Sequence, residues 1–338
     1  MNGIQTIFPA KNQCVMEVFD VPQKLEGNEI LTQTLTSLIS AGTEVSIYNG
    51  SHTTHQRPEI TWGKYPFRPG YAACGKVIAV GPEVKSLKVG DHVLTRAPHT
   101  SHYVTSEDAV YACPKGISPE EVPLAVLAAI SMNGIRHSDI ALGTITVIVG
   151  QGLLGLFALQ LAKMGGAYPV IAADISEKRL ELSKQFGADE IIHSGKNNIV
   201  EAITAATKGK MADRVVEVTG LARLIPDCLK LLRKGGMLYL LGGAHGNVEI
   251  DFYSELVRKN LSIVGGHEAG AAMVEDYHFP WTVSANIRHC LELIALKKLD
   301  VGPLISNRIS PNEVPKYYGL LSERAGDYLG VLIDWTKL

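Results

Sequence analysis

Three glycines at fixed spacing have the clearest chemical meaning in this sequence. They lie in Gly150-Gln151-Gly152-Leu153-Leu154-Gly155, a G-x-G-x-x-G turn. Between a buried strand and a helix, such a turn brings the backbone close to a pyrophosphate and turns helix amides toward it. Residues 144–149 form an apolar β-branched run, and residues 153–164 follow as an apolar helical segment. The turn therefore lies in the required context and predicts a dinucleotide site.

An acidic residue follows at the distance that such a site needs. Asp174 comes about 20 residues after the turn and ends the strand candidate 169–173. A carboxylate there accepts hydrogen bonds from ribose hydroxyls and repels a 2′-phosphate, so we expect NAD rather than NADP. Lys178 and Arg179 lie close behind and soften that preference. The alternative is a glycine turn needed only for packing, with Asp174 as a helix cap.

The elements around the turn alternate between strands and helices. We expect a helix over 176–186, with Ser176 as its cap and Gly187 as its stop, and another over 225–232. Further buried strands are predicted at 214–218, 237–241 and 261–264. This alternation is typical of an α/β fold with a doubly wound parallel sheet.

The regions outside this sheet have a different pattern. The first 120 residues are predicted to be β-rich, with strands near 75–80 and 91–94 and a polar loop over 49–58. A helix start is predicted at 118–121, where Pro119 is followed by two acids. The tail mixes a helix over 287–296 with a strand near 328–333.

Composition excludes several classes. The 338 residues suggest two domains, and a net charge of -2 argues against nucleic acid as a partner. No apolar run is long enough to span a membrane, and the start of the chain shows no secretion signal, so we expect a cytoplasmic protein without a membrane partner. The five cysteines are widely spaced without C-x-x-C, which argues against a disulfide framework or a clustered zinc site.

With these motifs together, the chain resembles the medium-chain dehydrogenase/reductase family, which includes the zinc alcohol and polyol dehydrogenases. The resemblance covers nearly the whole length. Besides the glycine turn, it is carried by Ser40–Gly50 (SAGTEVSIYNG), Pro69–Val77 (PGYAACGKV), Val89–Val93 (VGDHV), Phe186–Asp189 (FGAD) and Leu240–Gly243 (LLGG).

The resemblance implies an architecture and a cofactor site. A GroES-like β-rich catalytic domain comes from residues 1–123 and 269–338, and a Rossmann NAD-binding domain from 124–268 is inserted between them. The nicotinamide and the substrate are expected in the cleft between the domains. The expected cofactor contacts are Gly150, Gly152, Leu153, Leu154, Gly155, Asp174, Arg179, Thr219, Gly242, Gly243, Ala244 and His267.

The departures from the family pattern concern metal. Zinc-dependent relatives carry a Cys where this chain has Ala41, and a His and a Glu where it has Tyr71 and Ala72. Alanine has no donor atom, and catalytic zinc needs about three protein ligands. The four closely spaced cysteines of the structural zinc lobe are also missing, because no cysteine lies between His92 and Tyr111. We therefore expect no metal at either site.

Without zinc, a side chain must move the proton of the reacting alcohol. Thr43 matches the hydroxyl relay position of the family, Ser46 stands where relatives often place a relay histidine, and Glu44 and Tyr71 neighbour the lost ligands in sequence. Tyr71 either serves as acid or base or only fills the empty metal pocket. Histidines suited to proton transfer are His52, His55, His99, His102 and His267.

Three functions fit these features. The first is a zinc-independent NAD-dependent dehydrogenase for a secondary alcohol such as a sugar, cyclitol or polyol, which the polar loop 49–58 favours. The second is a zinc-free quinone or enoyl reductase, which Asp174 disfavours because such relatives prefer NADPH. The third is a non-catalytic NAD(H)-binding protein, which Thr43 disfavours. The resemblance also implies a homodimer formed through the edge of the Rossmann sheet.

Overall fold

The computed structural model describes residues 1–274, 280–323 and 328–338. By packing, the chain divides into two compact units. Met1–Val126 and Leu291–Leu338 form the first unit, so it is built from both ends of the chain, and Leu127–Cys290 forms the second. Among the described residues, no helix is both long enough and apolar enough to cross a bilayer.

The second unit contains the parallel sheet that the alternating pattern predicts. Its strand order is β10-β9-β8-β11-β12-β13, and every neighbouring pair is parallel. The chain therefore starts in the middle of the sheet and winds outward in both directions, as in a doubly wound fold. The strands are β8 (Thr146–Val149), β9 (Val170–Asp174), β10 (Glu190–His193), β11 (Ala212–Glu217), β12 (Leu232–Leu240) and β13 (Ser262–Gly265).

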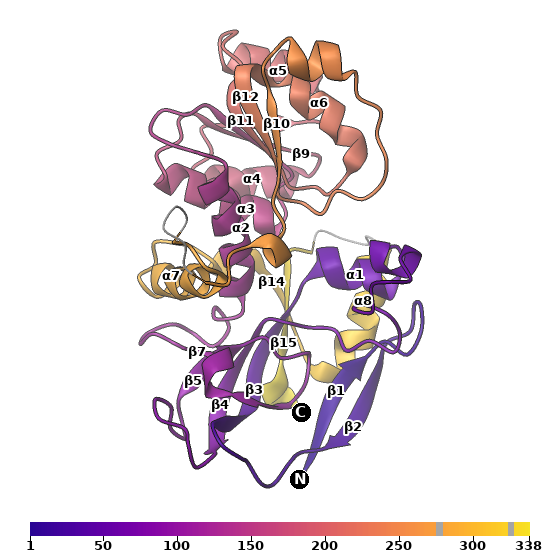
Figure 1. Cartoon of the computed structure of the whole chain (residues 1–338), viewed down its shortest axis with the longest axis vertical. Coiled ribbons are helices and arrows are strands. Elements are labelled where there is room, and N and C mark those ends of the chain that lie inside the picture. Colours follow the sequence, from indigo (N-terminus) through magenta and orange to yellow (C-terminus); the bar gives the residue numbers. More distant parts are fainter. Residues whose placement is uncertain (275–279, 324–327) are drawn as a thin grey trace. The chain divides into compact units, whose positions relative to one another are not determined.

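Helices cover this sheet, as Figure 1 shows in its magenta to orange part. Alternate residues of the central strands, including Val147, Val149 and Val215, pack with α5 and α6 in one apolar core. The helices that contact the strands are α3 (Leu153–Met164), α4 (Glu177–Gln185), α5 (Ile199–Ala206) and α6 (Ile225–Lys230). The unit also includes most of α2 (Leu124–His137) and of α7 (Val283–Ala295), each of which contains a boundary between the units.

The first unit is mainly antiparallel β structure. One sheet has the order β14-β15-β3-β4-β5-β7, with β6 paired to β3, and β1 and β2 form a separate hairpin. The strands are β1 (Asn2–Ile7), β2 (Val15–Asp20), β3 (Glu29–Ile39), β4 (Ala73–Val80), β5 (His92–Thr95), β6 (His102–Ser106), β7 (Tyr111–Ala112), β14 (Ile305–Ile309) and β15 (Gly330–Asp334). Among the described residues of this unit, the α-helices that lie wholly within it are α1 (Ala41–Tyr48) and α8 (Val314–Ser322).

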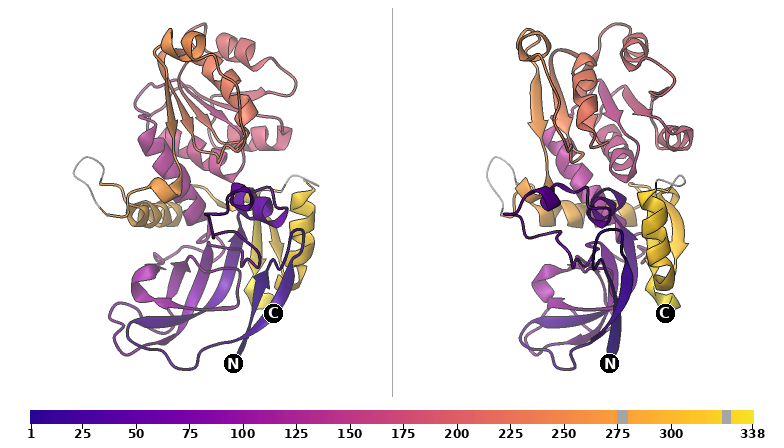
Figure 2. Two further views of the ribbon diagram at one scale, coloured as in Figure 1. Left: turned by 45° about the vertical axis from the view of Figure 1, so that its right-hand side comes forward. Right: turned by 90° about the vertical axis from the view of Figure 1, so that its right-hand side faces the viewer.

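The two chain ends are joined inside the first unit. The C-terminal strand β15 pairs antiparallel with β3, and Figure 2 shows the yellow C-terminal elements beside the indigo N-terminal strands. Phe8 and Ile47 from the first part of the chain share an apolar core with Tyr318 and Trp335 from the last part. The C-terminal segment is therefore an integral part of the core around α1.

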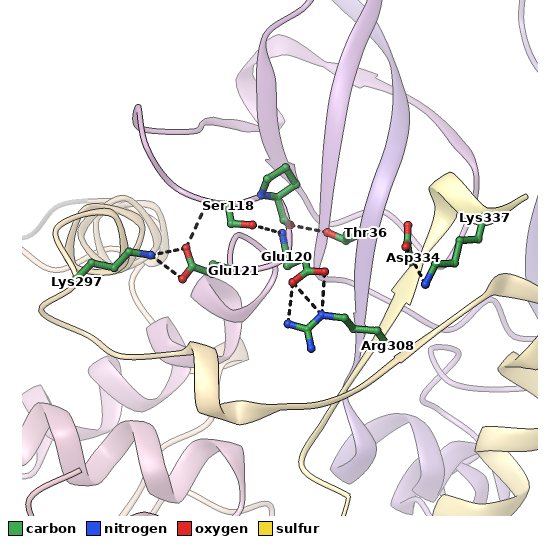
Figure 3. A network of polar contacts seen from close by, with 9 residues as sticks. Thr36, Ser118, Glu120, Glu121, Lys297, Arg308, Asp334 and Lys337 are labelled. Carbon is green, nitrogen blue, oxygen red and sulfur yellow. Dashed lines mark hydrogen bonds and ion pairs between the residues drawn. The ribbon is translucent and has the colours of Figure 1, made fainter. Parts of the chain in front are cut away.

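The start of α2 differs from the prediction. The helix begins at Leu124, and residues 119–123 form turns. Glu120 is paired with Arg308 (2.8 Å) and Glu121 with Lys297 (2.7 Å), as Figure 3 shows. The two acids therefore tie the segment before α2 to the C-terminal part of the same unit instead of forming a first helical turn.

Candidate active site

The predicted cofactor contacts all follow strands of the parallel sheet at their carboxyl ends. The glycine turn follows β8, Asp174 ends β9, Thr219 follows β11 and His267 follows β13. Gly242, Gly243 and Ala244 follow β12, and Arg179 lies in the first turn of α4. In doubly wound sheets this edge is where nucleotides bind.

The geometry of the turn explains its glycines. Gly150 has a φ of +99°, a conformation that side chains disfavour. A Cβ on Gly155 would lie 1.9 Å from the carbonyl oxygen of Gly150, so only glycine allows α3 to pack this close to the turn. A Cβ on Gly152 would meet nothing within 4 Å. The space beside Gly152 is open, at the uncapped start of α3, as a pyrophosphate cradle requires.

Asp174 is built into the same turn. It is only 8% exposed, and its carboxylate accepts hydrogen bonds from the backbone amides of Gln151 (2.6 Å) and Ser176 (2.8 Å). The carboxylate therefore links the turn to the start of α4, where the Ser176 side chain accepts from the amide of Arg179. Each carboxylate oxygen can accept a further hydrogen bond, so ribose hydroxyls would find acceptors here.

A second buried carboxylate shapes the neighbouring strand end. Glu217 at the end of β11 accepts from the amides of Thr219 (2.6 Å) and Gly220 (3.3 Å) and from the Thr219 hydroxyl. Burial raises the pKa of Glu217, and these hydrogen bonds oppose the rise. Thr219 is thereby fixed beside Gly150, since a Cβ on Gly150 would lie 2.7 Å from its methyl carbon.

The proton-transfer candidates Thr43, Glu44 and Ser46 all lie on α1, in the first unit. Ser46 donates its hydroxyl to the carbonyl oxygen of Thr43 (2.7 Å), so its side chain is used within the helix. Thr43 is half-buried, and its hydroxyl makes no hydrogen bond within the part of the chain that the structure describes. Of these three side chains, the one on Thr43 is available to a substrate.

Glu44 is the centre of an internal network. It is 1% exposed, and its carboxylate accepts from three donors: the amide of Ser40 (3.1 Å), His99 Nε2 (3.0 Å) and the hydroxyl of Tyr318. Burial, followed by the Glu44 charge, raises the pKa of Tyr318 well above its usual range, so the phenol stays a donor. Because both of its carboxylate oxygens are engaged by donors inside the protein, Glu44 is placed to hold structure.

Tyr71 reaches the same helix from the loop before β4. Its hydroxyl donates to the side-chain oxygen of Ser40, the residue that precedes α1. Tyr71 is half-buried, so its phenol is neither enclosed like Tyr318 nor fully in solvent. The structure therefore brings Tyr71 and the start of α1 together.

The candidate histidines fall into different settings. His99 is completely buried on Glu44, so it does not touch a substrate directly. His52 and His55 lie in the polar loop after α1, and their rings pack against Trp62 and Tyr65 respectively. Of the remaining candidates, His102 forms a hydrogen bond with the Ser101 side chain, and His267 lies in the second unit with its side chain exposed.

Most side chains of the network around Glu44 were not predicted from the sequence. His99 was named only as a proton-transfer candidate, and Ser40 only as the first residue of the SAGTE run. Tyr318 and Trp335 come from the other end of the chain, and Ser37 lies outside that run. The one signal was that run itself, because it placed Glu44 next to the expected relay position. Partners so far away in sequence carry no local pattern.

The residues at the expected zinc position do not fit a zinc ion. The side chains of Ala41 and Ala72 have no atom that could coordinate zinc, and the Tyr71 hydroxyl donates a hydrogen bond to Ser40. Across residues 1–274, 280–323 and 328–338, no three His, Cys, Asp or Glu side chains are grouped so that they could hold a metal. Tetrahedral zinc uses Cys, His or carboxylate ligands, which this position lacks.

The fold and the glycine turn define a nucleotide-dependent oxidoreductase with a β-rich first unit and a Rossmann second unit. The family model described as "Alcohol dehydrogenase GroES-like domain" matches residues 38–122, and the one described as "Zinc-binding dehydrogenase" matches residues 154–280. The two ranges together span more than half of the chain. The chain belongs to the medium-chain dehydrogenase/reductase family, which confirms the predicted fold, and is an NAD(P)-dependent oxidoreductase of the alcohol dehydrogenase type.

Individual relatives agree with this assignment. The chain is 28% identical to L-threonine 3-dehydrogenase from Pyrococcus abyssi, with 91% of each chain covered. It is 26% identical to D-xylulose reductase from Saccharomyces cerevisiae, with 86% of each covered. A solved structure of an Escherichia coli oxidoreductase of unknown specificity matches 99% of both chains with a TM-score of 0.85 at 20% identity.

Proposed function

We propose that this protein is a zinc-independent, NAD-dependent dehydrogenase that transfers a hydride between a secondary alcohol and the nicotinamide. The observation that best supports this proposal is the identity of the side chains at the expected zinc position. Two alanines stand there with a phenol that is hydrogen-bonded to the start of α1, next to the residue pair Thr43 and Glu44. A phenol and a hydroxyl can move a proton where no metal acidifies the alcohol.

Each candidate then has a role that its contacts support. The Thr43 hydroxyl, which has no hydrogen-bond partner among the described residues, contacts the reacting oxygen. Tyr71 takes up the alcohol proton as a phenolate in oxidation and returns it as a phenol in reduction. Glu44 and Ser46 hold α1 in place, because their polar atoms are used inside the protein. The bound nicotinamide supplies the hydride acceptor in oxidation and the hydride donor in reduction.

Residues 124–268 form the cofactor domain in this proposal, and Asp174 gives the preference for NAD. Its carboxylate is held at the turn by hydrogen bonds from two backbone amides. A carboxylate at this position accepts hydrogen bonds from the ribose hydroxyls and repels a 2′-phosphate. Arg179 lies within the same helix turn and contacts the adenosine part of the cofactor.

The substrate class follows from the relatives and the polar loop. L-threonine is named in one matched relative, and the D-xylulose named in another gives a polyol such as xylitol when its ketone is reduced. Both alcohols carry a secondary hydroxyl next to a carbon that bears a polar group. The loop after α1 contributes hydroxyl, imidazole and amide side chains between Asn49 and Gln56. We therefore propose a sugar, cyclitol or polyol-like secondary alcohol.

The test is turnover by metal-stripped protein. Protein dialysed against a chelator is mixed with NAD or NADP and with L-threonine, xylitol, sorbitol, myo-inositol or a quinone, and nicotinamide reduction or oxidation is followed by absorbance. We expect NAD-dependent turnover of a secondary alcohol, unchanged by chelation and lowered about 100-fold in Tyr71→Phe. Activity that disappears with the metal and returns with zinc overturns the proposal. NADPH-only turnover of the quinone supports the reductase instead, and NAD binding without any turnover supports a non-catalytic protein.

We also propose a cytoplasmic homodimer. Strand β13 ends the sheet order, with no described strand on its outer side, and the nearby Phe252, Tyr253 and Val257 are exposed apolar side chains. An open strand edge beside apolar surface favours pairing with a second copy. Sedimentation equilibrium should give a dimer for the wild type and a monomer for the double variant Phe252→Glu/Val257→Glu, whereas a wild-type monomer overturns this part.

A further inference from the structure

Ser40 stands at the position that normally caps a helix, but its side chain does not cap α1. The residue precedes Ala41, and no amide of the first turn donates to its hydroxyl oxygen. Serine at such a position usually accepts a hydrogen bond from the second or third helical amide. The Ser40 oxygen instead accepts from the phenol of Tyr71. The Ser40 side chain therefore does not cap α1 but binds Tyr71, 31 positions away in the sequence.

Glu44 performs part of the capping function that Ser40 gives up. Its carboxylate accepts from the backbone amide of Ser40 at 3.1 Å and places a negative charge in the first turn of α1, where the helix dipole favours it. This contact fixes the backbone of Ser40. The position of the Ser40 hydroxyl, and of the phenol bonded to it, therefore depends on where Glu44 is held.

His99 and Tyr318 hold Glu44 from the side opposite to Ser40. Both side chains are completely buried, and both donate to the same carboxylate oxygen, Oε2. The backbone of His99 packs closely against Gly70, the residue just before Tyr71. A Cβ on Gly70 would lie only 2.5 Å from the backbone nitrogen of His99. The backbone amide of His99 also donates to the carbonyl oxygen of Pro69 (2.7 Å).

The network continues beyond His99 to the C-terminal part of the chain. The Nδ1 atom of His99 lies 2.8 Å from the Ser37 hydroxyl, on the side of the ring away from Glu44. The indole of Trp335 donates to the same Ser37 oxygen at 2.9 Å, and an indole nitrogen is only a donor. Both ring nitrogens of His99 therefore have a partner, and the imidazole is held at both ends.

We propose that Ser40 and His99 are positioning residues for the reaction. His99 holds Glu44, Glu44 holds the backbone of Ser40, and the Ser40 hydroxyl fixes the direction of the Tyr71 phenol. This inference rests on the proposed role of Tyr71 in proton transfer. It goes beyond that role because it names side chains that never touch the substrate but set the geometry of the phenol that does.

The test is a double-mutant cycle on kcat, measured with NAD and with the alcohol among L-threonine, xylitol, sorbitol and myo-inositol that the wild type turns over fastest. Ser40→Ala should lower kcat about tenfold, the value of one lost hydrogen bond, while KM and the dissociation constant of NAD change less than about twofold. Ser40→Thr, which keeps the hydroxyl, should recover most of the activity. In a Tyr71→Phe background, Ser40→Ala should have no further effect, because the phenol on which it acts is gone.

The outcomes separate the two proposals. If Tyr71→Phe keeps wild-type kcat, or if wild-type protein turns over none of the four alcohols named above, the proton-transfer role of Tyr71 fails and this inference falls with it. If Tyr71→Phe loses activity but Ser40→Ala does not, only the inference is overturned. Equal losses from Ser40→Ala in both backgrounds also overturn it, because Ser40 then acts independently of Tyr71.

A second pair of variants tests His99. His99→Gln keeps an amide donor near the position of Nε2, whereas His99→Leu removes it. We expect kcat to fall about tenfold more in His99→Leu than in His99→Gln, again with an unchanged dissociation constant for NAD. Where His99→Leu does not fold, as seen by circular dichroism, Tyr318→Phe replaces it, since that change removes a donor from the same oxygen. Wild-type kcat in both His99→Leu and Tyr318→Phe overturns the role of the buried network.

Discussion

The cofactor turn and the network around Glu44 are built in opposite ways. The turn is local, and its decisive contacts are between backbone atoms, such as the approach of Gly155 to the carbonyl oxygen of Gly150. The Glu44 network is made of side chains that lie up to 298 positions apart, as Trp335 and Ser37 do. At the turn, a substitution is tolerated only where the backbone leaves space for a side chain. In the Glu44 network, a substitution is tolerated only where each hydrogen-bond donor keeps an acceptor.

The largest effect is expected at the turn. A methyl group on Gly155 would lie 1.9 Å from the Gly150 oxygen, and backbone at both places leaves little room to yield. Gly155→Ala should therefore lower the free energy of unfolding by about 3 kcal/mol or more and abolish NAD binding. Urea unfolding and isothermal titration calorimetry measure the two effects.

Gly152→Ala is the matched control for this prediction. Its φ is -74°, and a Cβ there meets nothing within 4 Å, so the unfolding free energy should change by less than about 0.5 kcal/mol. NAD affinity should still fall about tenfold or more, since the methyl group fills the space of the pyrophosphate. Wild-type affinity in this variant would mean that the cofactor lies elsewhere.

The next effect is expected at Glu44. Glu44→Gln keeps the shape of the side chain but turns one acceptor into a donor that faces Ser40, His99 or Tyr318. One buried donor then lacks an acceptor, which should cost about 1–3 kcal/mol of the unfolding free energy. Glu59→Gln on the exposed loop is the control and should be neutral. Equal stability of the two variants would contradict the three-donor arrangement.

A smaller effect, on affinity, is expected at Asp174. Asp174→Ala removes the acceptor of the ribose and the charge that repels a 2′-phosphate, so NAD affinity should fall about tenfold while NADP affinity does not fall. The ratio of the two dissociation constants is the measurement. Because Asp174 also holds two amides, both affinities would drop together if its role were only structural, and the ratio would stay unchanged.

The sequence predicts the local features of the molecule well. The spacing of Gly150, Gly152 and Gly155 placed the turn after β8, and α3 begins and ends at the residues expected. Ser176 caps α4, and Gly187 after that helix has a positive φ of +91°. Each of these depends on a few neighbouring residues, so a pattern along the chain is enough to reveal it.

Tertiary contacts decide what the sequence does not predict. Helix α1 contains Gly42, Thr43 and Val45, which disfavour helices, yet it forms because Glu44 holds its start and Ile47 is buried in the core. The late start of α2 depends on Arg308 and Lys297, far along the chain. The partners of Glu44 could not be predicted for the same reason.

Glu217 tests the difference between local and long-range contacts, because it is a buried carboxylate whose hydrogen-bond donors are its neighbours in sequence. It accepts from Thr219 and Gly220, two and three residues on, whereas Glu44 depends on distant side chains. Burial raises the pKa of Glu217 in the folded protein. The folded state therefore binds this proton more tightly than the unfolded chain, and its contribution to stability is present below the unfolded pKa and is lost as the pH rises through the folded value.

This predicts a pH slope that a single substitution removes. Across the window above the ordinary pKa of a glutamate, the unfolding free energy of the wild type should fall with rising pH relative to that of Glu217→Gln, whatever constant amount the substitution itself costs. Urea unfolding of both proteins over a series of pH values measures the difference. Parallel curves would mean that the local amides offset the burial of Glu217 completely, and that a carboxylate held by its own turn needs no proton to be buried.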